Sequence, residues 1–158
     1  MKKIIVASSF VFCAIIFVSF NGVNNGTLKQ NFSDSLEKDR AKYTALVMAQ
    51  IKGKENLPAD SIFKNLKMLK GMPVTRLLAI MNIGFSKSLG VSCGHCHNTD
   101  DFSSEEKKQK EITRQMAAMS KEINDNLLKH IDGLQSNPAV INCTTCHRGE
   151  IKPALNIK

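Results

Sequence analysis

The chain has 158 residues, a length that suits one domain, and it carries a formal charge of +8 from 22 basic and 14 acidic residues. With no Trp and one Tyr, it lacks an aromatic platform on which nucleic-acid bases could stack. A mildly basic surface could bind nucleic acid, an anionic membrane or an acidic protein, and the missing aromatic platform argues against nucleic acid.

The first 20 residues have the layout of an export segment. Lys2 and Lys3 precede an apolar run from Ile4 to Phe20, as a positive n-region precedes an apolar h-region. The run is close to the roughly 20 residues that cross a membrane, so a cleaved signal peptide and a retained N-terminal anchor fit equally well. Either one predicts that the rest of the chain lies on the periplasmic side of the inner membrane. Cys13 lacks the small residues that precede a lipidated cysteine, so we interpret it as an ordinary apolar residue.

An Asn- and Gly-rich stretch follows and predicts a flexible linker over residues 21–33. One all-α domain, with about four helices and no convincing strand, is then expected over residues 34–158. Its first helix is expected over residues 34–52, because Asp34 and Glu37 have the spacing of a capping box.

Three further helices are expected from apolar residues that recur at spacings of three and four. They cover residues 56–73, residues 74–88 and a segment from about residue 103 to residue 128 or 131. The last of them begins with Ser103 and Glu106, which again have the spacing of a capping box. A loose internal repeat results, in which a helix with methionine on its apolar face is followed by a break and then by a short cysteine motif.

That motif is Cys-x-x-Cys-His, and it occurs twice, with residues Cys93, Cys96, His97 and Cys143, Cys146, His147. Two cysteines three apart can each add a thiol across a vinyl group of haem, and the adjacent histidine then supplies a nitrogen ligand to the iron. Zinc binding, a thioredoxin-like redox motif and plain disulfides are the alternatives. A four-cysteine zinc site would not need the histidines, and a redox motif would need a βαβ context. The pattern therefore predicts two covalently bound haems of the c type.

The ligand on the other side of each iron is sought on the preceding helix. Met81 is the natural candidate for the first haem, although a methionine on an apolar stripe is usually a core residue. For the second haem, Met116, Met119 and His130 lie near one helical face, and periodicity does not choose among them. A histidine such as His130 is more often a helix C-terminal residue than a ligand.

Two further residues near the signatures need no role at the iron. We expect His95, inside the first signature, to be solvated, since it cannot easily reach the iron that His97 holds. Arg148, beside the second signature, could pair with a haem propionate or remain an exposed arginine.

The residues also resemble a known family. The stretches "IFKNLKMLKGMPVTRLLAIMNIGFSKSLGVSCGHCHN", "ITRQMAAMSKEIN" and "INCTTCHRG" are similar to the cytochrome c subunit of photosynthetic reaction centres and its small dihaem relatives. The resemblance covers roughly residues 60–153. It implies that Met81 and Met116 are the distal iron ligands and that Met119 packs against the second haem. The full subunit of that family has four haem sites, whereas this chain has two signatures.

These observations predict an exported dihaem c-type cytochrome, similar to the reaction-centre subunit, that carries single electrons between redox protein partners. A membrane-bound electron-transfer complex is one such partner, and the pathway is either photosynthetic or respiratory. Methionine and histidine on both irons leave no substrate position, so an electron carrier rather than an enzyme is expected. The alternatives are a dihaem peroxidase with an open iron position and a zinc-binding interaction module.

Overall fold

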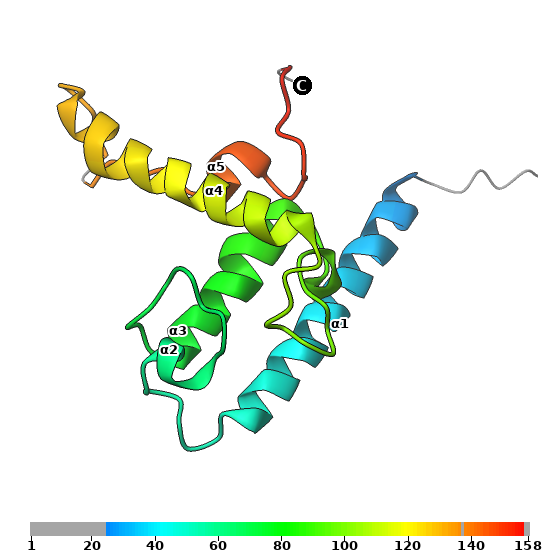
Figure 1. Ribbon diagram of the computed structural model, residues 1–158. Helices are drawn as coiled ribbons and strands as arrows, with labels where there is room; N and C mark the ends of the chain where they lie inside the picture. Colours follow the sequence, from blue (N-terminus) through cyan, green and yellow to red (C-terminus); the bar gives the residue numbers. More distant parts are fainter. Residues whose placement is uncertain (1–24, 137, 157–158) are drawn as a thin grey trace, which may run out of the picture.

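The computed structural model describes residues 25–136 and 138–156, and this part of the chain is helical (Figure 1). Within it the only β-type pairing is an isolated bridge between Pro58 and Pro73, so the predicted all-α class is confirmed. No helix in these residues is both long and apolar enough to span a membrane. The predicted export segment, residues 1–20 with Cys13, lies outside the described residues.

The helices follow one another in the order α1 (Asn25–Gln50), α2 (Ala59–Ile62), α3 (Val74–Ala79), the π-helix η1 (Ile80–Lys87), the 3₁₀ turn η2 (Cys93–His95), α4 (Lys108–Glu122), the π-helix η3 (Ile123–Leu127), the 3₁₀ turn η4 (Leu128–His130) and α5 (Cys143–His147).

Helix α1 begins earlier than its expected start. Residues 25–33, part of the predicted linker, are its first turns, whereas residues 21–24 of that linker lie outside the described residues. The sequence explains the extension, because no Gly or Pro interrupts residues 27–51. The predicted capping box was therefore wrong: Asp34 accepts a hydrogen bond from the side chain of Gln30 at 3.0 Å, in mid-helix.

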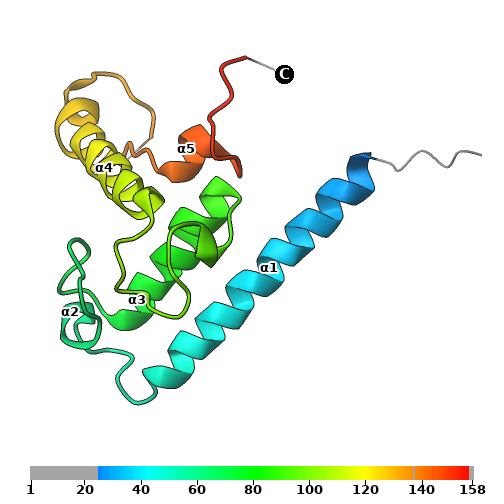
Figure 2. The same cartoon turned by 45° about the vertical axis from the view of Figure 1, so that its right-hand side comes forward.

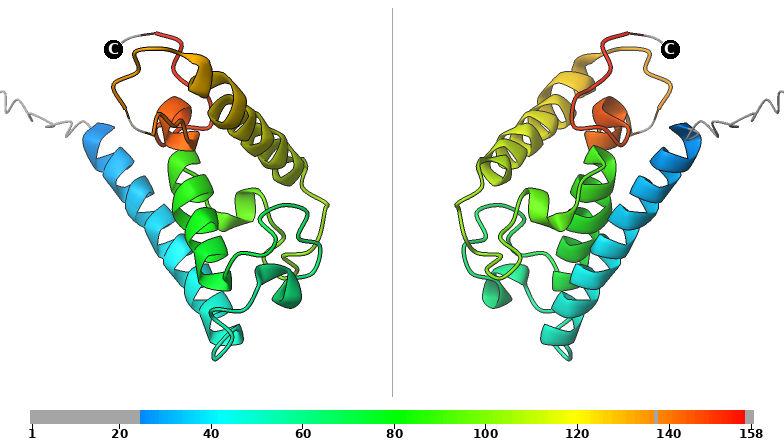
Figure 3. Two further views of the ribbon diagram at one scale, coloured as in Figure 1. Left: turned by 90° about the vertical axis from the view of Figure 1, so that its left-hand side faces the viewer. Right: turned by 90° about the vertical axis from the view of Figure 1, so that its right-hand side faces the viewer.

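The core of the fold lies where α1, α2 and α3 meet. Its buried members are Val47, Ile51, Ala59, Val74 and Leu77, and each large apolar side chain among them contributes about 1.5–3 kcal/mol through burial. Helix α1 runs beside the continuous helix of α3 and η1 in the opposite direction (Figure 2). The α3–η1 helix in turn lies between α1 and α4 (Figure 3).

The segment expected to form the second helix is mostly a loop. Only Ala59–Ile62 is helical, and Asn65 and Leu69 take left-handed backbone angles, with φ of 61° and 62°. The loop closes on itself because the amide of Ala59 donates to the carbonyl of Met72 at 2.8 Å. The apolar spacing was a sign of burial and not of a helix, since Ile62, Leu66 and Leu69 still pack against the core.

The third predicted helix is confirmed, with a change of hydrogen-bond register inside it. It starts at Val74 as α3 and continues as the π-helix η1 to Lys87. Gly90, with φ of +64°, then reverses the chain into the first signature. Single turns of π-helix are often found at functional sites, and Met81 lies in this one.

The fourth predicted helix begins later than expected, as α4 at Lys108. Ser103 does not cap it; its amide and hydroxyl instead bond Oδ1 of Asp101 at 2.9 and 2.6 Å. The second signature is itself a short helix, α5, which was not predicted. Asn142 caps α5 in a reciprocal box with Thr145, and α5 lies against the end of η1 (Figure 3).

Candidate functional site

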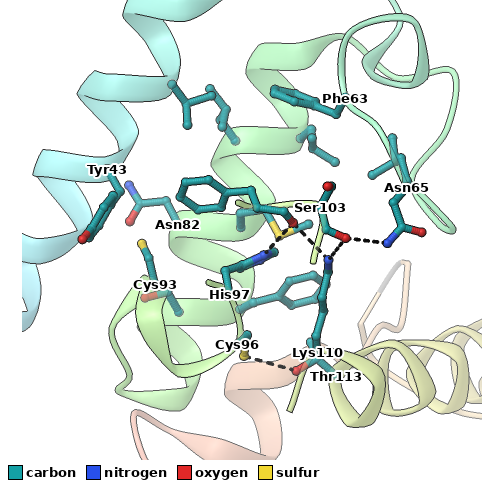
Figure 4. Close-up of a pocket in the computed structure, with 18 of the residues that line it drawn as sticks. Tyr43, Phe63, Asn65, Asn82, Cys93, Cys96, His97, Ser103, Lys110 and Thr113 are labelled. Carbon is teal, nitrogen blue, oxygen red and sulfur yellow. Dashed lines mark hydrogen bonds between the residues drawn. The ribbon is translucent and has the colours of Figure 1, made fainter. Parts of the chain in front are cut away.

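Four predicted haem-site residues, Met81, Cys93, Cys96 and His97, line a single cavity of about 250 Å³. Figure 4 shows the two cysteines and the histidine around the same space as Tyr43 of α1 and Phe63 of the 63–72 loop. The cavity wall is largely apolar, with Val47, Phe63, Leu66, Leu77, Phe85 and Val91 among its members. The fold therefore brings the predicted thioether, imidazole and thiols of the first site together.

Three side chains hold the first signature in place. The backbone amide of Cys93 donates a hydrogen bond of 2.9 Å to Oδ2 of Asp39 on α1. On the other side, the ammonium of Lys107 donates a hydrogen bond to the carbonyl of Gly94. The hydroxyl oxygen of Thr113, on α4, lies 3.8 Å from the sulfur of Cys96. The signature is thus clamped between the first and the fourth helices.

The imidazole of His97 is oriented by a backbone carbonyl. Its Nδ1 lies 3.3 Å from the carbonyl oxygen of Phe102, and with Nδ1 as the donor its Nε2 is free to bind a metal. The Phe102 ring packs on the imidazole, with ring centroids 5.3 Å apart. Burial, and then the charge of Lys110, lower the pKa of His97. The ring is therefore held neutral, the form that binds iron.

The four signature cysteines are free, and burial keeps the thiols of Cys93, Cys96 and Cys143 protonated. Burial, followed by the carboxylate of Asp39, raises the pKa of Cys93 to about 11. Burial also raises the pKa of Cys96 and of Cys143. A thioredoxin-like redox site has the opposite property, a lowered thiol pKa.

A shared zinc site is not assembled in this part of the chain. Among the described residues, no three His, Cys, Asp or Glu side chains come together as ligands for a metal ion.

The second signature lies on α5, at the other end of the α3–η1 helix from the core. Its histidine is oriented as in the first site, since Nδ1 of His147 lies 3.0 Å from the carbonyl oxygen of Glu150. The candidate ligands Met116 and Met119 are on α4, with 38% and 48% of their surfaces exposed, beside Ile112 at 57%. The methionines share an apolar helix face, and neither belongs to the cavity of the first site.

The remaining predicted residues lie apart from the first cavity. His130 is exposed at the end of η4, where its Nδ1 hydrogen-bonds the carbonyl of Asn126. His95 is half-buried within η2, and Arg148 is exposed directly after α5 with φ of 51°.

Several residues that position the two sites were not found from the sequence. Asp39 has no motif around it, although it shares the inward face of α1 with Arg40 and Val47. Asn124 of η3 bonds both backbone groups of Ile141, at 2.7 and 2.9 Å, just before the second signature. Lys110 had no sequence signal, because its role depends on the carbonyls of residues 102–104, which the turn before α4 brings to its ammonium.

The donor set and the cavity fit a haem of the c type. An apolar lining, a methionine thioether, a neutral imidazole and two thiols three residues apart are the groups that hold such a haem. The second signature repeats the thiols and the imidazole beside a helix that carries methionines.

Comparison with known proteins agrees with this chemistry. The chain is 32% identical over 83 residues to cytochrome c-554 of Chloroflexus aurantiacus, an alignment covering 52% of this chain and 20% of that protein. It is 35% identical over 79 residues to the photosynthetic reaction center cytochrome c subunit of Rubrivivax gelatinosus, covering 44% and 22%. The aligned segments thus span about a fifth of these relatives' length. Residues 19–156 match the family described as "Photosynthetic reaction centre cytochrome C subunit", and the chain belongs to that family of c-type cytochromes.

Proposed function

We propose that this chain is an exported c-type cytochrome with two haems that carries single electrons between redox partners. The observation that carries the proposal is the first cavity. There the fold gathers Met81 and the cysteines and histidine of the first signature within one apolar lining. Membership of a cytochrome family supports the same chemistry.

In the first site, Cys93 and Cys96 would hold the haem through thioether bonds, and His97 and Met81 would bind its iron. Bound in this way, haem supplies a one-electron couple whose potential is raised by methionine–histidine ligation. The chain's own contribution is to exclude water with the apolar lining. It also holds the imidazole at a fixed angle through the Phe102 carbonyl.

In the second site, Cys143, Cys146 and His147 would play the same roles. Met116 is our choice for the distal ligand, with Met119 packing against the haem, as the family resemblance implies. Support comes from the apolar, partly exposed α4 face that carries both methionines and from Asn124, which ties that helix to the chain entering α5.

The two sites are joined directly, which suits the passage of an electron between them. The amide of Gly149 donates to the carbonyl of Ser88 at 2.8 Å, and the hydroxyls of Ser88 and Thr144 are 2.6 Å apart. Thr144 lies inside the second signature, and Ser88 ends the helix that carries Met81. We call these contacts, together with that of Gly90 on Gly149, the inter-site joint.

The cellular setting is part of the proposal. Residues 1–20 would act as signal peptide or membrane anchor and bring the domain of residues 34–158 to the periplasmic side of the inner membrane. A membrane-bound electron-transfer complex is the proposed partner, and the name of the Rubrivivax gelatinosus relative supports it. A carrier rather than an enzyme is proposed, because a methionine in the first cavity would close the iron site that a peroxidase must open.

A redox-titrated visible spectrum and a mass measurement test this proposal on protein made in a host that assembles c-type cytochromes. We expect a mass increase of two haems and two low-spin spectral components. Met81→Ala should make one component high-spin and Met116→Ala the other, whereas Met119→Ala and the matched control Met48→Ala on α1 should change neither. A colourless protein, or peroxide turnover by the unmodified protein, would refute the carrier proposal.

A further inference from the structure

In both signatures, Nδ1 of the histidine lies within hydrogen-bond distance of a backbone carbonyl oxygen. The two carbonyls differ in the other hydrogen bonds that they accept. The Glu150 carbonyl that faces His147 receives no other hydrogen bond from the described residues. The Phe102 carbonyl that faces His97 is also bonded by the ammonium of Lys110, at 3.0 Å. The His97 contact is accordingly the longer of the two, 3.3 against 3.0 Å.

Lys110 is placed there by a cage of three consecutive carbonyls. Besides Phe102, its Nζ donates to the carbonyl oxygens of Ser103 and Ser104 at 3.2 and 2.8 Å. A fourth contact joins the ammonium to Oε1 of Glu105 at 3.3 Å, and only 10% of the lysine side chain is exposed. A lysine in the first turn of α4 opposes the helix dipole, so the dipole does not account for its position.

The shared carbonyl has a consequence for the first iron. A carbonyl that accepts the Nδ1 proton strongly makes the imidazole a more basic ligand, which favours the ferric state. A cation on the same carbonyl weakens that acceptance, and its charge, which the carboxylate of Glu105 offsets in part, also disfavours the ferric state.

We propose that Lys110 is a positioning residue that acts through the Phe102 carbonyl and His97 to raise the reduction potential of the first haem relative to the second. This inference rests on the proposed function. The step concerned adds one electron from the redox partner to the first iron and moves no proton within the chain.

The experiment measures the reduction potentials of Lys110 variants that keep or remove its charge. The holoproteins are titrated with visible detection. Lys110→Met removes the ammonium, Lys110→Gln keeps an amide donor without the charge, and Lys110→Arg keeps both the charge and the donors. Lys108→Met, an exposed lysine of the same helix, is the control for lost charge alone. Met81→His, which replaces a methionine ligand by histidine and lowers the potential, identifies the wave of the first haem.

We expect Lys110→Met to lower the equilibrium constant for reduction of the first haem by about tenfold, about 59 mV for one electron. The second wave should stay in place. Lys110→Arg should retain most of the original potential, and Lys110→Gln should fall between. The Nδ1 proton signal of His97 in NMR spectra of the reduced protein should move in Lys110→Met and not in Lys108→Met.

The inference is overturned if Lys110→Met shifts the first haem no more than Lys108→Met does, or if both haems shift equally. It is also overturned if Lys110→Arg falls as far as Lys110→Met, because Lys110 would then serve only to fasten the turn. If Lys110→Met does not fold, Lys110→Gln decides in the same way. Failure of the proposed function is distinct from these outcomes, since the unmodified protein would then show no pair of haem waves.

Discussion

Gly90 shows at the scale of one residue how the two sites are held together. Its backbone is left-handed, with φ of +64°, and a Cβ atom at this position would overlap the carbonyl oxygen of Gly149. The residue is therefore required twice, once for the turn into the first signature and once for the close approach of the second. Gly71 is also left-handed, with φ of +74°, but has nothing within 4 Å of the same position.

We expect Gly90→Ala to lower the free energy of unfolding by more than about 2 kcal/mol, because backbone strain and steric overlap add. Gly71→Ala, which has the strain alone, should cost about 1 kcal/mol. Chemical denaturation of the two holoproteins measures both. Equal losses in the two variants would show that the Gly90–Gly149 approach adds nothing beyond the left-handed turn.

At the scale of elements, the start of α4 is fixed by an ion cluster and not by a capping side chain. Glu105 bonds both terminal nitrogens of Arg114, at 2.6 and 2.7 Å, and lies 3.3 Å from the Lys110 ammonium. The hydrogen bond from Arg114, helped by bonds from Lys110 and Asn65, lowers the pKa of Glu105 well below 4.5. A carboxyl whose pKa is lowered in the folded state stabilises the fold above its unfolded pKa and loses that effect as pH falls.

The stability difference between the unmodified protein and Glu105→Gln should therefore be constant at neutral pH and shrink progressively below about pH 4.5. Denaturation at a series of pH values measures it. Glu106→Gln is the control, since the side chain of Glu106 has only a 3.4 Å contact with Asn98. If the stability difference between the unmodified protein and Glu105→Gln stayed the same at the lowest pH, the ion cluster would not be its cause.

Elements were predictable from the sequence where local spacing and tertiary burial agree. The α3–η1 helix was found because its apolar stripe also faces the core. The segment after Ile62 was wrongly predicted as a helix. Its apolar residues are buried from a loop, and the left-handed residues Asn65 and Leu69 that shape the loop are not glycines. The late start of α4 depends on contacts of Glu105 with Asn65 and Arg114, which lie 40 and 9 residues away in the chain.

The same contrast holds for the candidate sites. The cysteines and histidines are close together in the sequence, so their spacing alone was enough to predict them as site residues, and the structure gathers the first set with Met81 around one cavity. The supporting residues Asp39, Lys110 and Asn124 come from other elements. Their roles follow from folded distances that no local pattern encodes.

For the whole molecule, burial is unevenly distributed. Every buried residue in the described part of the chain lies at or before Val91, so the hydrophobic core belongs to α1, α2 and α3. The later residues are held by hydrogen bonds such as those of Asn124 and by the inter-site joint. The proposed second haem, attached by Cys143 and Cys146, would supply the apolar contacts that this half otherwise lacks.

Replacing Cys143 and Cys146 by Ala should therefore loosen residues 123–156, which follow the part of α4 that lines the first cavity, while the first site keeps its haem and its spectrum. We expect protease cleavage in this region to accelerate at least about tenfold, because its local opening free energy would fall by more than about 1.4 kcal/mol. Limited proteolysis with mass spectrometry locates the cuts. The matched control Thr144→Ser keeps both cysteines and the hydroxyl, and it should leave the cleavage rate unchanged.

The inter-site joint uses two hydroxyl groups, one backbone hydrogen bond and the contact of two glycines, and no charged side chain takes part in it. Surface charges can consequently be exchanged during evolution, to suit a new donor or acceptor, without altering the distance between the two signatures. Natural selection can thus adapt the outside of this protein independently of its internal spacing.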